Sequence, residues 1–172
     1  MQNDPRHRHA GLLERLAAYS ISHRDQSPLD HRRAANRALR DAIAGHLGEV
    51  GLRLEQAIRA CVARGALSEV AALERLRALA ERIAQRVRHA GPGSRALAHP
   101  KSPDGAPDPI HALDLDLYHR VEVLLRRFDA PDNDHDFLPA IMAELTSMER
   151  RLDDRAFLIA AAKPKPVPLD DL

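Results

Sequence analysis

The chain has 172 residues with 44% hydrophobic but only 3% aromatic content, and it contains no tryptophan. A chain of this length fits one domain, whose core has to consist of Leu, Ala, Ile and Val, as in bundles of helices. The single cysteine excludes an internal disulfide, and the net charge of +1 excludes a strongly basic or strongly acidic protein.

The N-terminal residues predict an arm and a short helix. Residues 1–10 are polar and lack periodicity, so we expect a flexible basic arm that carries Arg6 and Arg8. Residues 11–21 place apolar side chains along one side of a helix that is too short to be stable alone and has to dock on the bundle or on another chain. The sequence has no apolar core of a signal peptide and no run long enough to cross a bilayer. We therefore expect a cytoplasmic protein without a membrane partner.

Residues 28–90 predict two helices that fold back on each other at Gly65. Ser27 and Pro28 form a helix start, Gly65 suits the left-handed residue that ends a helix, and Ser68 is the expected cap of the second helix. Apolar residues recur at spacings of three and four on both sides of this turn, as in a coiled coil. The register pairs Leu47 with Val87, Leu54 with Ala80 and Cys61 with Leu73, which places the cysteine in the core.

Three glycines inside the first of these helices leave two interpretations open. Gly45, Gly48 and Gly51 each cost a helix up to about 1 kcal/mol relative to alanine, so they could mark a break. The apolar face continues through them, which favours one continuous or kinked helix. Gly45 and Gly48 fall on the face opposite the seam, so they either soften the helix or allow a further helix or partner to approach.

The second half of the chain predicts another hairpin. Residues 91–109 are too rich in glycine and proline for a helix or strand, so we expect a linker. Asp108 and Pro109 then restart a helix. The alternation over residues 113–123 would also fit a strand, but no second strand is available to pair with it. After an acidic turn over residues 129–136, a last helix follows, in a register that pairs Leu124 with Ile141, Leu117 with Met148 and Ile110 with Ala156.

These elements predict an all-α fold in which two antiparallel helical hairpins form a four-helix bundle, with a short N-terminal helix beside it. We expect one helical domain over residues 11–162, with hairpins over 28–90 and 110–162 joined by the linker over 91–109. Alternating prolines make residues 163–172 an extended tail.

The polar residues do not form a pattern typical of a metal site. His119 and Glu122 reverse the Glu-x-x-His order of di-iron bundles. Together with His111, Asp114 and Tyr118 they fall outside the apolar stripe, where we expect a solvated face. Asp132, Asp134 and Asp136 begin like a calcium loop, but Phe137 stands where that loop requires glycine.

Nucleophilic catalysis has no better support in the sequence. Cys61 is expected in an apolar core, where the reactive thiolate is disfavoured. No glycine-rich loop lies between a strand and a helix, as a phosphate-binding loop would. We expect no metal, no cofactor and no enzymatic activity.

The charges are distributed unevenly along the chain. Residues 1–99 contain 17 Lys and Arg against 10 Asp and Glu, whereas residues 100–172 contain 9 against 15. The basic half either contacts a polyanion or packs against the acidic half, of the same chain or of a second copy. The near-zero net charge and the scarcity of aromatic residues for base stacking favour packing. The candidate polyanion contacts are Arg6, Arg8, Arg32, Arg33, Arg37 and Arg40, although Arg32 and Arg40 project toward the seam and could pair with carboxylates of the second hairpin.

We expect a non-enzymatic helical interaction protein: an adaptor, a scaffold or a small subunit of a larger assembly. The excess of arginine over lysine is typical of a GC-rich genome and suggests a bacterial source. The expected partner is a protein, which includes a second copy of the chain in a homodimer. The tail can lie in a partner's groove in extended form, through Pro164, Pro166, Pro168 and Leu169. The alternative is a nucleic-acid-binding subunit that contacts backbone phosphates through the basic N-terminal half.

Overall fold

A computed structural model describes residues 28–91, 109–129 and 137–161 of the chain, which form four helices and, within these ranges, no strand. The helices are α2 (Pro28–Ala63), α3 (Leu67–His89), α4 (Pro109–Asp129) and α5 (Phe137–Ala161). Helix α4 excludes the strand interpretation of residues 113–123. The expected N-terminal helix over 11–21 lies outside the described residues.

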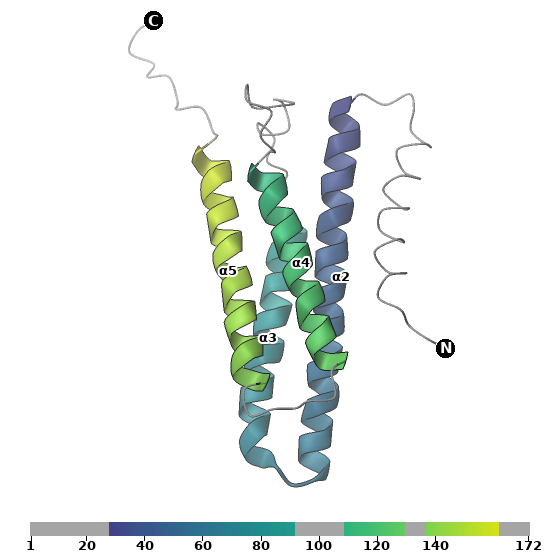
Figure 1. Cartoon of the computed structure of the whole chain (residues 1–172), viewed down its shortest axis with the longest axis vertical. Coiled ribbons are helices and arrows are strands. Elements are labelled where there is room, and N and C mark those ends of the chain that lie inside the picture. Colours follow the sequence, from purple (N-terminus) through teal and green to yellow (C-terminus); the bar gives the residue numbers. More distant parts are fainter. Residues whose placement is uncertain (1–27, 92–108, 130–136, 162–172) are drawn as a thin grey trace, which may run out of the picture.

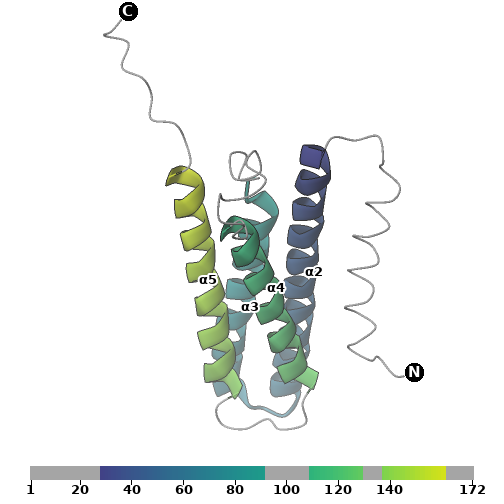
Figure 2. The same ribbon diagram turned by 45° about the horizontal axis from the view of Figure 1, so that its top comes forward.

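The four helices pack as a bundle whose consecutive helices run in opposite directions (Figures 1 and 2). Helix α2 packs against α3 and α4, and α5 packs against the same two helices, so α2 and α5 lie on one diagonal. Helices α2 and α4 start at the same end of the bundle, where α3 and α5 finish (Figure 1). We call this the open end, and the predicted fold of two antiparallel hairpins is confirmed.

Helix α2 continues without a break through its three glycines. A Cβ atom built on Gly45, Gly48 or Gly51 would meet no atom within 4 Å, so none of the other described helices packs closely against them. Of the two interpretations, the structure therefore has the continuous helix. The helix survives this cost because Leu47, Val50 and Leu54 are each at most 1% exposed in the core.

The turn between α2 and α3 depends on Gly65, which has a φ of +75°. The Gly65 and Ala66 amides donate to the carbonyls of Val62 and Cys61, which closes the end of α2 as the sequence predicts. The predicted cap at Ser68 is wrong, because α3 already begins at Leu67 and no side chain caps it. The Ala66 carbonyl instead accepts the Glu69 amide within the first turn.

The predicted apolar seams form the core, with two exceptions on the second hairpin. Asp114, Tyr118 and Glu122 were expected on a solvated face but are at most 9% exposed, because this side of α4 packs against α2. Ala156 was expected to face inward but is exposed, and Arg155 lies inside instead at 2% exposure. Cys61 is buried as predicted, and this burial raises the pKa of its thiol.

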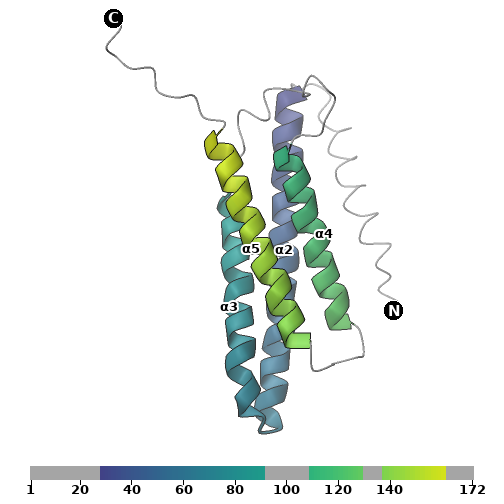
Figure 3. The ribbon, with the colours of Figure 1, turned by 60° about the vertical axis from the view of Figure 1, so that its left-hand side comes forward.

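The basic first hairpin and the acidic second hairpin are joined by ion pairs. Arg82 lies 2.9 Å from Glu149, and Arg86 lies 2.6 Å from Asp153. Toward the other end of the bundle, Arg53 pairs with Asp129 at 2.9 Å. The first hairpin also extends beyond the second at its turn (Figures 1 and 3).

Candidate functional site

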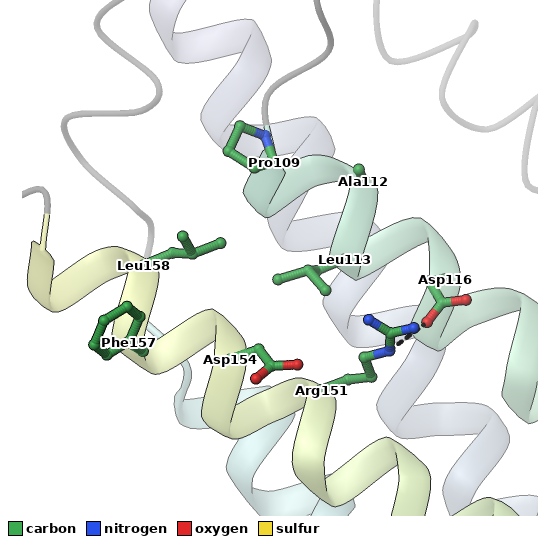
Figure 4. A pocket seen from close by; sticks show the side chains of 8 residues that line it. All are labelled: Pro109, Ala112, Leu113, Asp116, Arg151, Asp154, Phe157 and Leu158. Atoms are coloured by element: carbon green, nitrogen blue, oxygen red, sulfur yellow. Dashed lines mark ion pairs between the residues drawn. The ribbon is translucent and has the colours of Figure 1, made fainter.

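A groove between α4 and α5 is the candidate binding site of the described bundle. It lies near the open end and has a volume of about 510 Å³. Figure 4 shows Leu113 from α4 and Leu158 from α5 pointing into the gap between the two helices. The residues that line the groove are Pro109, Ala112, Leu113, Asp116, Arg151, Asp154, Phe157 and Leu158.

The end of α5 beside this groove is apolar on every side. Residues 156–161 contain only Ala, Phe, Leu and Ile, although the bundle covers only one face of them. Phe157 is 72% exposed and points away from α4 in Figure 4. A helix that is apolar all round is normally enclosed on all sides. This end of the bundle therefore presents apolar surface that the described residues leave uncovered.

Most of the charged groups at the groove form ion pairs with each other. Asp116 accepts from Arg120 at 2.9 Å and lies 3.2 Å from Arg151. Hydrogen bonds to Asp116 and Glu144 raise the pKa of Arg120. These interactions fix the polar rim of the groove, while its floor remains apolar. A rigid apolar slot with a charged rim suits the apolar face of an amphipathic helix.

A buried polar cluster supports α4 and α5 behind the groove. Arg155 donates from Nε to Asp114 Oδ1 at 2.8 Å, and the two side chains are 3% and 1% exposed. Asn36 on α2 donates to the other carboxylate oxygen at 3.2 Å and accepts from Arg40 Nη1 at 2.6 Å. The cluster thus ties α2, α4 and α5 together at the open end.

Arg40 is the less well compensated of the two buried arginines. Its Nε has no hydrogen-bond partner among the described residues, and its Nη1 bonds Asn36, whereas Arg155 bonds the Asp114 carboxylate directly. Burial, followed by the repulsion from Arg155, lowers the pKa of Arg40. Because Asp114 on α4 is bonded by Asn36 from α2 and by Arg155 from α5, the cluster has a structural role.

A second polar group continues along the contact between α2 and α4. His46 and Tyr118 lie with their ring centroids 5.4 Å apart, one turn of α4 before Glu122. Burial raises the pKa of Tyr118 to about 12, and the charge of Glu122 and a hydrogen bond to it act in the same direction. The contact between α2 and α4 is therefore much more polar than the seam between α2 and α3.

The structure separates the arginines that were predicted to contact a polyanion. Arg33 and Arg37 are exposed on α2, whereas Arg40 is 7% exposed in the buried cluster. Arg32 belongs to α2, but its side chain is not described. Arg6 and Arg8 lie outside the described residues, as do Pro164, Pro166, Pro168 and Leu169 of the tail.

Two smaller hollows lie elsewhere on the bundle. One, of about 320 Å³, lies between the ends of α3 and α5 and is lined in part by Arg86, His89 and Arg155. The other, of about 230 Å³, follows α2 and α3 past Gly48 and Gly51. The sequence pattern does not predict these hollows or the α4–α5 groove. Only the apolar run at residues 156–161, which continues on all faces of a helix, could have indicated uncovered surface.

The described helices contain no group of three or more His, Cys, Asp or Glu side chains placed to hold a metal ion. Among the same helices, none is both long enough and apolar enough to cross a membrane. Comparisons with protein-family models, with curated proteins and with solved structures found no match to this chain.

Proposed function

We propose that this protein is a non-enzymatic adaptor or scaffold that holds an amphipathic helix of a partner protein in the α4–α5 groove. The observation that carries this proposal is the apolar floor of the groove, beside an end of α5 that is apolar on every face. A partner helix would cover Leu113 and Leu158 with its apolar stripe and leave its polar face to solvent.

The rest of the bundle suits a rigid platform. The groove walls are held by the ion pair between Asp114 and Arg155 from inside and by the ion pair between Asp116 on α4 and Arg151 on α5 at the rim. Fixing the walls before binding reduces the ordering cost of association. The strongest polar interactions near the groove thus position its walls.

The test is to fill the groove from an exposed wall position. Ala112 lines the groove and is exposed, so Ala112→Arg places a long side chain in it without disturbing the core. His111, the neighbouring residue, is also exposed but does not line the groove, so His111→Arg is the matched control. Tagged full-length chain would be isolated from its source cells, and the captured protein would then be purified and titrated by calorimetry.

We expect the partner to bind the wild type and His111→Arg equally and to bind Ala112→Arg at least about tenfold more weakly. The introduced arginine would block the apolar contact between the partner and the groove, and such a contact contributes about a kcal/mol or more to binding. Equal binding by all three chains would exclude the groove. Circular dichroism melts of the three chains would show that each is folded. Capture of nucleic acid in place of a protein would favour the nucleic-acid alternative instead.

A further inference from the structure

Helix α5 carries two lines of residues with the same heptad spacing on opposite faces. The inner line faces the core and consists of Ile141, Leu145, Met148, Leu152, Arg155 and Ile159, of which the first five are buried and Ile159 is half-buried. The outer line has the same spacings of four and three and consists of Ala143, Ser147, Arg150, Asp154, Phe157 and Ala161. Ser147 is half-buried and the other five are exposed, so no described element of the bundle covers this outer seam.

The order of residues along the outer seam is complementary to itself when reversed. In an antiparallel pair of α5 helices related by a two-fold axis, Arg150 of one copy meets Asp154 of the other. The same register places Phe157 opposite Ser147 and Ala143 opposite Ala161. Each of the six outer-seam residues thus lies opposite another outer-seam residue of the second copy. The two residue numbers of every pair add up to the same value, as one common antiparallel register requires. The large side chain meets a small one, and the positive side chain meets a negative one.

The two charged residues of the outer seam are not used in ion pairs between the described helices. Arg150 and Asp154 form no ion pair with any residue of the described helices. By contrast, Arg120, Arg151 and Arg155 of the same two helices each pair with an aspartate. They are also four residues apart in the order that puts the cation first, which is the weaker arrangement for pairing within a helix. Pairing between copies would use both charges.

The exposure of Phe157 points in the same direction. At 72% it is the most exposed large hydrophobic side chain among the described residues. An aromatic side chain in that position costs solubility unless it is covered, and aromatic residues are enriched at the centres of interfaces. The net charge of +1 per chain means that two copies repel each other little.

We propose that two copies of this chain associate through the outer seams of their α5 helices, packed antiparallel about a two-fold axis. The proposal rests on the proposed function as an interaction protein and names a second copy as one of its partners. The outer seam and the groove share Phe157 and Asp154 but not Ala112, so the two partners can be separated by mutation.

The test is a charge swap on the full-length chain, measured by sedimentation equilibrium over a range of concentrations. We expect a reversible dimer for the wild type. Arg150→Asp places like charges opposite each other at two symmetric positions and should weaken the dimer by roughly tenfold or more. Asp154→Arg should do the same for the opposite reason. The double variant Arg150→Asp/Asp154→Arg restores complementary charges and should dimerise again.

Three controls make the result decisive. Phe157→Ser should weaken the dimer, whereas Arg127→Asp, a reversal at an exposed position on α4, should leave it unchanged. Thermal melts should show that each variant is folded. A wild type that stays monomeric at all concentrations would overturn the proposal, as would a dimer indifferent to the single reversals or a double variant that fails to recover. Partner binding that still depends on Ala112 would leave the groove proposal standing in each of those cases.

Discussion

Tyr118 is the residue whose ionisation the fold opposes most clearly. Its phenol is 8% exposed and lies beside Glu122, so burial and a neighbouring negative charge both disfavour the phenolate. The folded pKa is raised to about 12 from an ordinary value of 10.0. The neutral phenol therefore stabilises the fold fully below pH 10, and this contribution is lost as the pH rises from 10 toward 12.

We predict that the wild type loses roughly 2 kcal/mol more of its free energy of unfolding than Tyr118→Phe over that pH interval, because the variant has no phenol to ionise at this position. Urea denaturation at a series of pH values measures the difference. The phenolate absorbance band gives a second readout, because the variant retains only Tyr19. A band that titrates fully near pH 10 in the wild type would contradict the raised pKa.

Asp114 is the anion on which the buried cluster depends. Asp114→Asn leaves Arg155 and Arg40 buried without a counter-charge, so we predict a loss of about 3–5 kcal/mol in the free energy of unfolding. Asp114→Leu/Arg155→Met removes the pair together and should be closer to the wild type, since it leaves fewer unpaired charges. Denaturant titration of the three chains checks this order. An Asn variant as stable as the wild type would show that the ion pair contributes little.

Apolar periodicity predicts which nonpolar residues are buried but not which polar residues join them. The positions of Leu117, Val121 and Leu124 follow from their spacing, and the structure confirms them at 0% exposure. Asp114 looks like a solvent-facing residue until its partners are known, and those partners are 78 and 41 positions away in the sequence. The apolar spacing sets the register of the helices, but it contains no signal that turns these polar side chains inward.

At the scale of elements, the two helical hairpins could be predicted because both seams extend on either side of one short turn. The register of α2 against α3 follows from two apolar seams joined by a short turn, and Gly65 has the left-handed φ that this turn needs. The α4–α5 groove depends on the distance between the two helices, and the spacing of apolar residues along the sequence does not determine that distance. The same holds for the hollow beside Gly48 and Gly51.

The glycines of the first hairpin allow a matched prediction. Gly48→Ala should raise the free energy of unfolding by up to about 1 kcal/mol, because the helix gains and the new Cβ meets no atom within 4 Å. Gly65→Ala also has open space but a φ of +75°, so it should lower the free energy of unfolding by about 1–2 kcal/mol. Thermal denaturation of both variants checks the opposite signs. A Gly48→Ala chain less stable than the wild type would contradict the continuous, unstrained helix.

At the scale of the whole molecule, the charge asymmetry of the sequence matches contacts between the two hairpins. Arg53, Arg82 and Arg86 of the basic half each pair with a carboxylate of the acidic half. Each pair is at least partly exposed, so its contribution to stability is small. Together the pairs favour the observed arrangement of the hairpins, since opposite charges select the faces that meet.

This arrangement limits what a polyanion could contact. Of the predicted arginines, Arg33 and Arg37 have exposed side chains in the structure, whereas Arg40 is buried beside Asn36. We therefore predict that fluorescence anisotropy with random single- and double-stranded DNA shows no binding at about 0.15 M salt, because two exposed arginines neutralise few phosphates and such contacts weaken as the salt concentration rises. Any binding at low salt should be lost in Arg33→Ala/Arg37→Ala and retained in the matched pair Arg126→Ala/Arg127→Ala, which is exposed at the far end of α4.

Arg40→Gln should change stability and leave low-salt binding as it is. Tight binding that persists at the higher salt and disappears in Arg33→Ala/Arg37→Ala would establish the nucleic-acid alternative. The number of phosphates contacted would then follow from the slope of log K against log salt concentration, which is about −0.9 for each phosphate neutralised.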